Sequence, residues 1–286
     1  MSVGSGSGSG ARPAGRGPLR TDALWRAVTD GSGGVGGPGG LWTSIEAVAS
    51  TGSTNADLLA RGGREGQVLV AERQTAGRGR AGRTWVSLPG TSLTFSVLLR
   101  PASVPSAARG WLPLLTGVAV AAAVRSAAGV AAVLKWPNDV LVGERKLAGI
   151  LAEQTPAGDA VVVGVGLNVA TRSAALPVSP TGLPATSLLV EGADVAREKL
   201  LIEILSSLER EYLAFRANPD PARCGLLAAY RAACGTLGRA VRVELPAGRV
   251  LTGTAENIDA NGRLLVRPAE GTAAIAVSAG DVIHLR

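Results

Sequence analysis

The stretch AAVLKWPNDVLVGERKLAGILAEQ, residues 131–154, determines the expected fold more than any other part of the chain. Segments 131–142 and 145–154 are both predicted to be extended, and the glycine at position 143 favours a turn between them. An antiparallel pair of this kind brings Asp139 and Lys146 into the same neighbourhood. The simplest alternative is a surface lysine–aspartate pair on a hairpin, which contributes little to stability.

The segments on either side of this hairpin predict a mixture of helices and strands. Extended segments are expected at 67–74, 93–99 and 160–169, and helices at 54–61, 111–128, 194–216 and 221–233. The longest apolar stretch, 111–124, is interrupted by Pro113 and Gly117 and is shorter than the roughly 18 residues that a membrane span requires. We therefore expect a buried helix and no membrane association.

The two ends of the chain differ from its centre in amino-acid composition and patterning. Residues 1–40 contain 13 of the 39 glycines, which predicts a largely flexible Gly/Ser-rich segment with a possible short helix at 19–28. After Gly235, short alternating runs separated by Gly, Pro and Asn-Gly predict a small antiparallel barrel. The chain should therefore divide into 1–40, 41–234 and 235–286.

The composition favours a cytoplasmic protein that binds an anion. Two cysteines cannot form a disulfide framework and no signal peptide is recognisable, so the thiols should be reduced. From Arg73 to Asn138 the chain has eight basic residues and no acidic one. This positive field suits a nucleoside triphosphate or a carboxylate, although a solvated basic face explains it equally well.

Within that stretch, Gly77 to Gly82 match the pattern G-x-G-x-x-G after a predicted strand. A dinucleotide site is disfavoured because the next element is extended and the acidic residue expected about 20 positions further on is missing. A glycine loop with Arg78, Arg80 and Arg83 can still wrap a phosphate, since backbone N–H groups approach closely and guanidinium groups neutralise charge. A purely structural glycine turn is the simpler interpretation.

Five segments, taken together and in this order, resemble the biotin protein ligases. They are Ser53-Thr54-Asn55, the run from Glu72 to Trp85, Lys135 to Asp139, Lys146 to Leu151, and Gly164 to Asn168. The resemblance extends from about Leu41 to the C-terminus. It implies an α+β fold, with a mixed or antiparallel sheet flanked by helices in a class II synthetase-like catalytic domain, followed by a small SH3-like β-barrel.

The activity implied by this resemblance has two steps. Biotin attacks the α-phosphate of ATP-Mg to give biotinyl-5'-AMP and pyrophosphate, and a lysine of a biotin carboxyl carrier protein, part of acetyl-CoA carboxylase or a related carboxylase, then takes the biotinyl group. Mg²⁺ would be held mainly by the ATP phosphates. Relatives that also repress transcription have a winged helix-turn-helix where this chain has its Gly/Ser-rich segment, so we expect a monofunctional ligase without sequence-specific DNA binding.

The resemblance also assigns roles to individual residues. Those expected to bind biotin are Ser53, Thr54, Asn55, Gln74, Arg78, Gly79, Arg80 and Lys146. Those expected to bind ATP are Arg78, Arg80, Arg83, Trp85, Lys135, Asn138, Lys146 and Asn168. Lys146, Arg78 and Asp139 are expected to be catalytic, with Lys146 stabilising the transition state and Asp139 positioning the acceptor lysine or the metal.

Two other functions remain open at this point. A lipoate-type protein ligase or acyltransferase joins an acyl group to a carrier lysine on a related fold. A basic, non-enzymatic nucleic-acid-binding protein would use its arginines and its C-terminal barrel on phosphates, and would show steeply salt-dependent binding.

Overall fold

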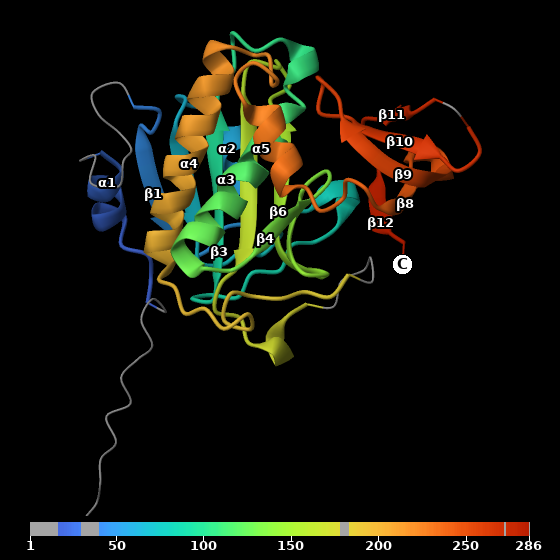
Figure 1. Ribbon diagram of the computed structural model, residues 1–286. Helices are drawn as coiled ribbons and strands as arrows, with labels where there is room; N and C mark the ends of the chain where they lie inside the picture. The colour runs from blue at the N-terminus through green and yellow to red at the C-terminus, as the bar shows by residue number, and fades with distance from the viewer. Residues whose placement is uncertain (1–16, 30–39, 178–182, 272, 286) are drawn as a thin grey trace, which may run out of the picture.

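The computed structural model describes residues 17–29, 40–177, 183–271 and 273–285. The Gly/Ser-rich runs of the predicted flexible segment lie outside these residues, whereas a helix, α1 (Thr21–Thr29), is present between them. A seven-stranded sheet in the order β1-β2-β3-β7-β6-β5-β4 forms the larger part of the molecule (Figure 1). Its strands are β1 (Ser44–Val48), β2 (Gln67–Ala71), β3 (Ser92–Leu99), β4 (Ala132–Lys135), β5 (Asp139–Val142), β6 (Arg145–Gln154) and β7 (Val161–Asn168).

This sheet is mixed, as the family resemblance implies. Strands β1 and β2 are parallel, and the other neighbouring strands are antiparallel. Figure 1 shows three helices together on one side of the sheet: α3 (Trp111–Ala128), α4 (Arg197–Ala217) and α5 (Leu226–Ala233). The short helix α2 (Thr54–Arg61) contacts β2, β3 and β7.

Alternation along the strands separates the two faces of the sheet. In β2, Val68 and Val70 belong to the large core under α3 and α4, whereas Leu69 packs with Leu58 of α2 in a smaller cluster. Because side chains alternate between faces, the polar Thr94 and Ser96 of β3 share the α2 face. That face is therefore the one that offers polar groups to a ligand.

The apolar stretch predicted as a buried helix is α3, and the prediction is confirmed. The helical stretch Ser106–Ala128 is long and apolar enough to cross a membrane, but 72% of its most apolar window is buried inside the protein. Trp111 and Leu115 of α3 have no exposed surface. Burial of this extent identifies α3 as the central helix of the core.

The hairpin prediction is partly wrong. Segment 131–142 is not one extended run but two strands, β4 and β5, joined at Trp136-Pro137-Asn138. Pro137 has no N–H to donate to a ladder, so the chain turns there and Lys135 pairs with Asp139. The turn at Gly143 is present, and it places Lys146 beside Asp139 as predicted.

Other elements also differ from prediction, most of all β1 and α5. Strand β1 was not predicted from the sequence, and α5 starts at Leu226 rather than at 221 because the residue before it, Gly225, has a left-handed φ of 85°. Gly235 is followed by β8 (Ala240–Glu244), β9 (Val250–Ile258), β10 (Leu264–Pro268), β11 (Ile275–Val277) and β12 (Asp281–His284). These strands form an antiparallel sheet in the order β11-β10-β9-β8-β12, in agreement with the antiparallel strands expected after Gly235.

The C-terminal sheet is docked onto the part of the chain that holds the seven-stranded sheet, through two buried tryptophans. Trp111 Nε1 donates to Ala260 O at 2.8 Å, and Trp136 Nε1 donates to Gly262 O at 3.0 Å. At the same junction the Trp136 N–H donates to Thr236 Oγ1, which lies 3.0 Å from His284 Nε2. The relative position of the two sheets is thus fixed by directional contacts.

His284→Gln should make stability less sensitive to acid. Burial, with repulsion from Lys135 and Arg239, lowers the pKa of His284 from 6.5 to about 4. Between pH 6.5 and pH 4, His284 binds a proton in the unfolded chain but not in the native protein. The neutral histidine therefore lowers the free energy of unfolding very little above pH 6.5, and increasingly as the pH drops toward 4. In urea unfolding, the wild type should lose about 2 kcal/mol more than the variant between pH 7 and pH 5. Equal losses would contradict a buried neutral histidine at this junction.

Candidate functional site

A cavity of about 1070 Å³ lies on the α2 face of the sheet and reaches the C-terminal domain. All the predicted site residues line it: Ser53, Thr54, Asn55, Gln74, Arg78, Gly79, Arg80, Arg83, Trp85, Lys135, Asn138, Asp139, Lys146 and Asn168. Its volume is at the upper end of the range for small-molecule sites, which suits two ligands side by side.

The first wall is a polar cluster at the start of α2. Ser53 is the N-cap, and its Oγ accepts from the Ala56 N–H at 3.5 Å. Thr54 donates to Gln74 Oε1 through its backbone N–H at 2.8 Å and through its hydroxyl at 3.0 Å. The helix start and the strand-to-loop junction after β2 are therefore tied together before any ligand arrives.

Asn55 extends this cluster onto the sheet. Its Nδ2 donates to Glu153 Oε2 at 2.8 Å, and its Oδ1 accepts from the Ser96 hydroxyl at 2.6 Å. A Cβ added at Gly164 would lie 2.2 Å from Asn55 Oδ1, so only glycine leaves space for this side chain. Sequence reasoning missed Ser96 and Glu153, although polar residues on one face of a strand are the signal that reveals such a cluster.

The loop from Gly77 to Trp85, called the Gly/Arg loop here, forms the second wall of the cavity. Arg78 Nη2 lies 3.2 Å from Glu153 Oε1, Arg80 Nη1 donates to Asn138 Oδ1 at 3.2 Å, and Arg83 Nη2 is paired with Asp281 Oδ1 at 2.7 Å. The chain folds back on itself here, with Arg78 bridged to Thr84 around one 3-10 turn. No long helix follows the glycines, which agrees with the exclusion of a dinucleotide fingerprint.

Trp85 lies over two glycines of the sheet, Gly149 and Gly166, which form the floor of the cavity between the two walls and are called the glycine floor here. Gly149 of β6 and Gly166 of β7 are cross-strand partners, and a Cβ on Gly166 would lie 2.1 Å from Trp85 Cε2. The Lys146 ammonium lies 5.9 Å from the indole centroid, within the range of a cation–π contact. The indole thus fills the space that side chains on these strands would otherwise occupy.

The cationic centre consists of two lysines around one carboxylate. Lys146 Nζ lies 2.7 Å from Asp139 Oδ1, and Lys135 Nζ lies 3.9 Å from Asp139 Oδ2. Burial lowers the pKa of Lys135; the Asp139 carboxylate opposes this effect, and the Lys146 charge reinforces it. The three groups together have a positive charge in a poorly solvated place, which favours an anionic ligand.

The segment at the end of β7 supports this centre. Asn168, which is 3% exposed, donates through Nδ2 to Thr186 O at 2.9 Å. The backbone of Lys146 donates to Pro184 O at 2.7 Å and accepts from Thr186 N at 2.8 Å. Asn168 therefore holds the strand-like segment that borders Lys146, besides facing the cavity.

The C-terminal domain contributes cavity residues that sequence reasoning missed. Arg239, Asp281 and His284 face the same cavity, and Glu144 of the β5–β6 turn lies beside them. Arg239 Nη1 donates to Glu144 Oε1 at 2.7 Å, across the boundary between the two parts of the chain. No motif in the sequence marks these residues because only the docking of the C-terminal sheet brings them to the site.

Comparisons with known proteins agree with this architecture. Residues 44–169 match the model of the Biotin/lipoate A/B protein ligase family, and residues 236–285 match that of the Biotin protein ligase C terminal domain. The chain is 46% identical to a biotin--[acetyl-CoA-carboxylase] ligase of Mycobacterium tuberculosis, an alignment that covers 87% of this chain and 92% of the relative. It is 35% identical to the enzyme of the same name from Paracoccus denitrificans, covering 78% and 94%.

A solved structure shows the same fold. The biotin protein ligase of Aquifex aeolicus in complex with biotin and ATP superposes with a TM-score of 0.71 at 28% identity, covering 86% of this chain and all of the other. The expected fold class is confirmed. The chain therefore belongs to the biotin protein ligase family.

Proposed function

We propose that this protein activates biotin with ATP to biotinyl-5'-AMP and transfers the biotinyl group to a lysine of a biotin carboxyl carrier protein. The observation that supports this most directly is the single cavity that joins a neutral polar cluster at one end to two lysines and an aspartate at the other. Biotin has the matching polarity, since its ureido ring is neutral and its carboxylate is charged. The names of the relatives, and the biotin and ATP in the Aquifex structure, support the same substrates.

The polar cluster would bind the ureido ring. Ser53, Thr54, Asn55 and Gln74 offer hydroxyl and amide groups that hydrogen bonds already orient: Thr54 bonds to Gln74, Ser53 to the Ala56 N–H, and Asn55 to Ser96 and Glu153. Arg78, Gly79 and Arg80 would complete this subsite from the loop side. Because these groups are held in place beforehand, little entropy is lost when the ligand binds.

The cationic centre would perform the adenylation. Both reactants are anions, and the ammonium of Lys146 can bind the biotin carboxylate and the α-phosphate, then stabilise the charge that develops as the new P–O bond forms. Arg78, Arg80, Arg83, Lys135 and Asn138 surround the same space and would hold the triphosphate. Trp85 would cover the nucleotide, and Asn168 would border its base.

Mg²⁺ would arrive with the nucleotide. Within the part of the chain that the structure describes, no group of three or more His, Cys, Asp or Glu side chains lies together. Asp139 is the carboxylate nearest to the reacting groups, and two lysines already contact it. The residues present fit an ion that is bound mainly by phosphate oxygens, with the Asp139 carboxylate available as a further ligand. The ion would neutralise phosphate charge.

Asp139 would act in the transfer step. Its carboxylate, held near the place where the mixed anhydride forms, can orient an incoming lysine and accept its proton. The carrier domain of acetyl-CoA carboxylase or a related carboxylase is the acceptor we propose. We also propose a cytoplasmic location, with which two free cysteines agree, and no role in sequence-specific DNA binding or at membranes.

One experiment tests this function against its alternatives. The protein is incubated with ATP-Mg and either biotin or lipoate, and pyrophosphate release and label transfer to a carrier domain are followed. We expect release and transfer with biotin. Transfer of lipoate alone would replace the substrate, and salt-dependent nucleic-acid binding without pyrophosphate release would replace the function.

Gly166→Ala should weaken substrate binding. The added methyl group needs the space that the Trp85 indole occupies, so the indole must leave the glycine floor. We expect KM for biotin or ATP to rise about tenfold, because a displaced wall costs roughly 1.4 kcal/mol of binding energy.

Gly52→Ala is the matched control for this variant. Gly52 precedes the polar cluster directly, but a Cβ added there has nothing within 4 Å. Its kinetics should equal those of the wild type. Unchanged kinetics in Gly166→Ala would mean that the position of Trp85 does not matter for either substrate.

A further inference from the structure

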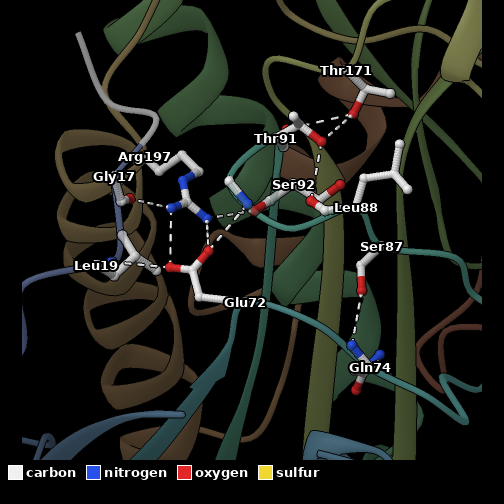
Figure 2. A network of polar contacts seen from close by, with 11 residues as sticks. Gly17, Leu19, Glu72, Gln74, Ser87, Leu88, Thr91, Ser92, Thr171 and Arg197 are labelled. Atoms are coloured by element: carbon white, nitrogen blue, oxygen red, sulfur yellow. Dashed lines mark hydrogen bonds and ion pairs between the residues drawn. The ribbon is translucent and has the colours of Figure 1, made fainter. Parts of the chain in front are cut away.

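A buried ion pair lies at the base of loop 73–91, the segment between β2 and β3 that includes the Gly/Arg loop (Figure 2). Arg197, the first residue of α4, is 1% exposed, and its guanidinium faces Glu72, which directly follows β2. Nη1 lies 2.8 Å from Oε2 and Nη2 lies 3.0 Å from Oε1, the two-pronged geometry of a strong pair. Burial alone would raise the pKa of Glu72, but the bonds from Arg197 and from two backbone N–H groups lower it, so the carboxylate is ionised.

The same pair holds both ends of one loop. Glu72 comes just before the loop, and its Oε2 accepts from the Gly90 N–H at 3.2 Å, near the loop's other end. Arg197 Nη1 donates at 3.0 Å to the carbonyl of Ser92, where β3 begins. The whole segment 73–91 is therefore closed by a single guanidinium–carboxylate unit.

The loop so closed contains much of the proposed substrate site, namely Gln74, Arg78, Gly79, Arg80, Arg83 and Trp85. Inside the loop, the Gln74 N–H donates to Ser87 Oγ at 3.2 Å, close to the base (Figure 2). Gln74 is only two residues beyond Glu72, so a shift of the ion pair would move the amide that Thr54 contacts. The position of Gln74 thus depends on the closure of the loop.

The N-terminal segment covers the pair from the other side. Arg197 Nη2 donates to Gly17 O at 2.7 Å, and Glu72 Oε1 accepts from the Leu19 N–H at 3.0 Å. Leu19, Leu24 and Val28 of this segment are buried in the main core. Residues 17–20, just before α1, therefore have a defined place at the back of the loop.

We propose that Glu72 and Arg197 are positioning residues of the ligase, whose buried pair fixes both ends of loop 73–91 and so preorganises the loop for biotin. This inference rests on the function proposed above. Arg197 and Gly17–Leu19 lie outside the two regions matched by the family models, 44–169 and 236–285.

A matched control exists on the same two elements. Arg216 near the end of α4 lies 2.7 Å from Glu65, which stands just before β2, whereas Glu72 stands just after it. The two pairs thus link one helix to opposite ends of one strand, and only the Glu72 pair contacts the loop. Arg216→Lys should weaken the structure without changing the loop.

The test compares Arg197→Lys with Arg216→Lys in the full chain. Lysine keeps the charge but cannot reach Glu72, Ser92 O and Gly17 O together. We expect KM for biotin to rise about tenfold in Arg197→Lys, with kcat at saturating substrates within about twofold of the wild type, because bound ligands restore the loop. Arg216→Lys should leave both constants unchanged.

Limited trypsin digestion gives a second readout, because the loop contains four trypsin sites: Arg73, Arg78, Arg80 and Arg83. Cleavage within 73–91 should be about tenfold faster in Arg197→Lys and return to the wild-type rate with biotin and ATP, as expected for local opening. Unchanged KM and loop cleavage, or faster cleavage along the whole chain that ligands do not reverse, would overturn the proposal.

If Arg197→Lys does not fold, Glu72→Gln tests the same proposal. The amide keeps an acceptor for Arg197 but places N–H groups where Oε2 accepts, so the contact to the Gly90 N–H is lost. The same rise in KM and in loop cleavage is expected, and a wild-type result would overturn the proposal. Failure of the wild-type protein to bind biotin in calorimetry would instead reject the proposed function, which separates the two outcomes.

Discussion

Lys146→Ala is expected to slow biotinyl-AMP formation about 10²- to 10³-fold, because one preorganised charge contact in the transition state contributes this much. The ammonium lies 2.7 Å from Asp139 and 5.9 Å from the centre of the Trp85 ring, so its place in the cavity is fixed on two sides. Truncation should leave the fold intact, since the backbone of Lys146 keeps its hydrogen bonds to Pro184 and Thr186. Pyrophosphate release under saturating biotin and ATP measures the effect.

The control for this prediction is Lys199→Ala. Lys199 is an exposed lysine on α4, away from the cavity-lining residues, and its loss changes the net charge by the same amount. Its adenylation rate should equal that of the wild type. Near-normal adenylation in Lys146→Ala would remove this lysine from the proposed mechanism, and equal losses in both variants would point to the overall field of the protein.

The hairpin pair could be predicted from the sequence because it depends on local chain geometry. The turn at Gly143 pairs Leu141 with Lys146 and Asp139 with Gly149, so Asp139 and Lys146 lie near each other on adjacent strands and their side chains meet at 2.7 Å. The turn at Pro137 was missed because the apolar run 131–142 has the composition of one strand. Because Pro137 has no backbone N–H to donate to a strand ladder, the chain turns there despite that composition.

Contacts between distant parts of the chain could not be predicted. Arg197 and Glu72 are 125 residues apart, and nothing in either neighbourhood indicates the other. Arg83 meets Asp281 only because buried tryptophans dock the C-terminal sheet onto the catalytic part. Strand β1 was missed for a different reason: Ile45 and Ala47 alternate with Ser44 and Glu46, but the strand has only five residues and none of them is fully buried, so its signal is weak.

Asp139→Asn should separate the two half-reactions, with the larger loss in transfer. Asparagine keeps the shape of the side chain but cannot take a proton from the acceptor lysine, so transfer from preformed biotinyl-AMP should slow about 10²-fold. Adenylation should fall less, because the cavity becomes more positive and still attracts both anionic substrates. Single-turnover transfer to a carrier domain, measured beside pyrophosphate release, gives the two rates.

The pH dependence of adenylation in Asp139→Asn provides an independent check. Burial already lowers the pKa of Lys135, and the Asp139 carboxylate is the main influence that opposes this. Without that charge the pKa of Lys135 must fall further, and a lysine that acts as a cation is lost as the pH rises through its pKa. The alkaline limb of the pH–rate profile should therefore move to lower pH than in the wild type.

Asp159→Asn is the control, because Asp159 pairs with Arg100 at an exposed site and neither residue lines the cavity. That variant should keep both rates and the wild-type pH profile. Equal losses of adenylation and transfer in Asp139→Asn would mean that the carboxylate only holds Lys146 in place. A selective loss of transfer together with the shifted alkaline limb requires that one carboxylate both receives the acceptor amine and keeps a buried lysine charged.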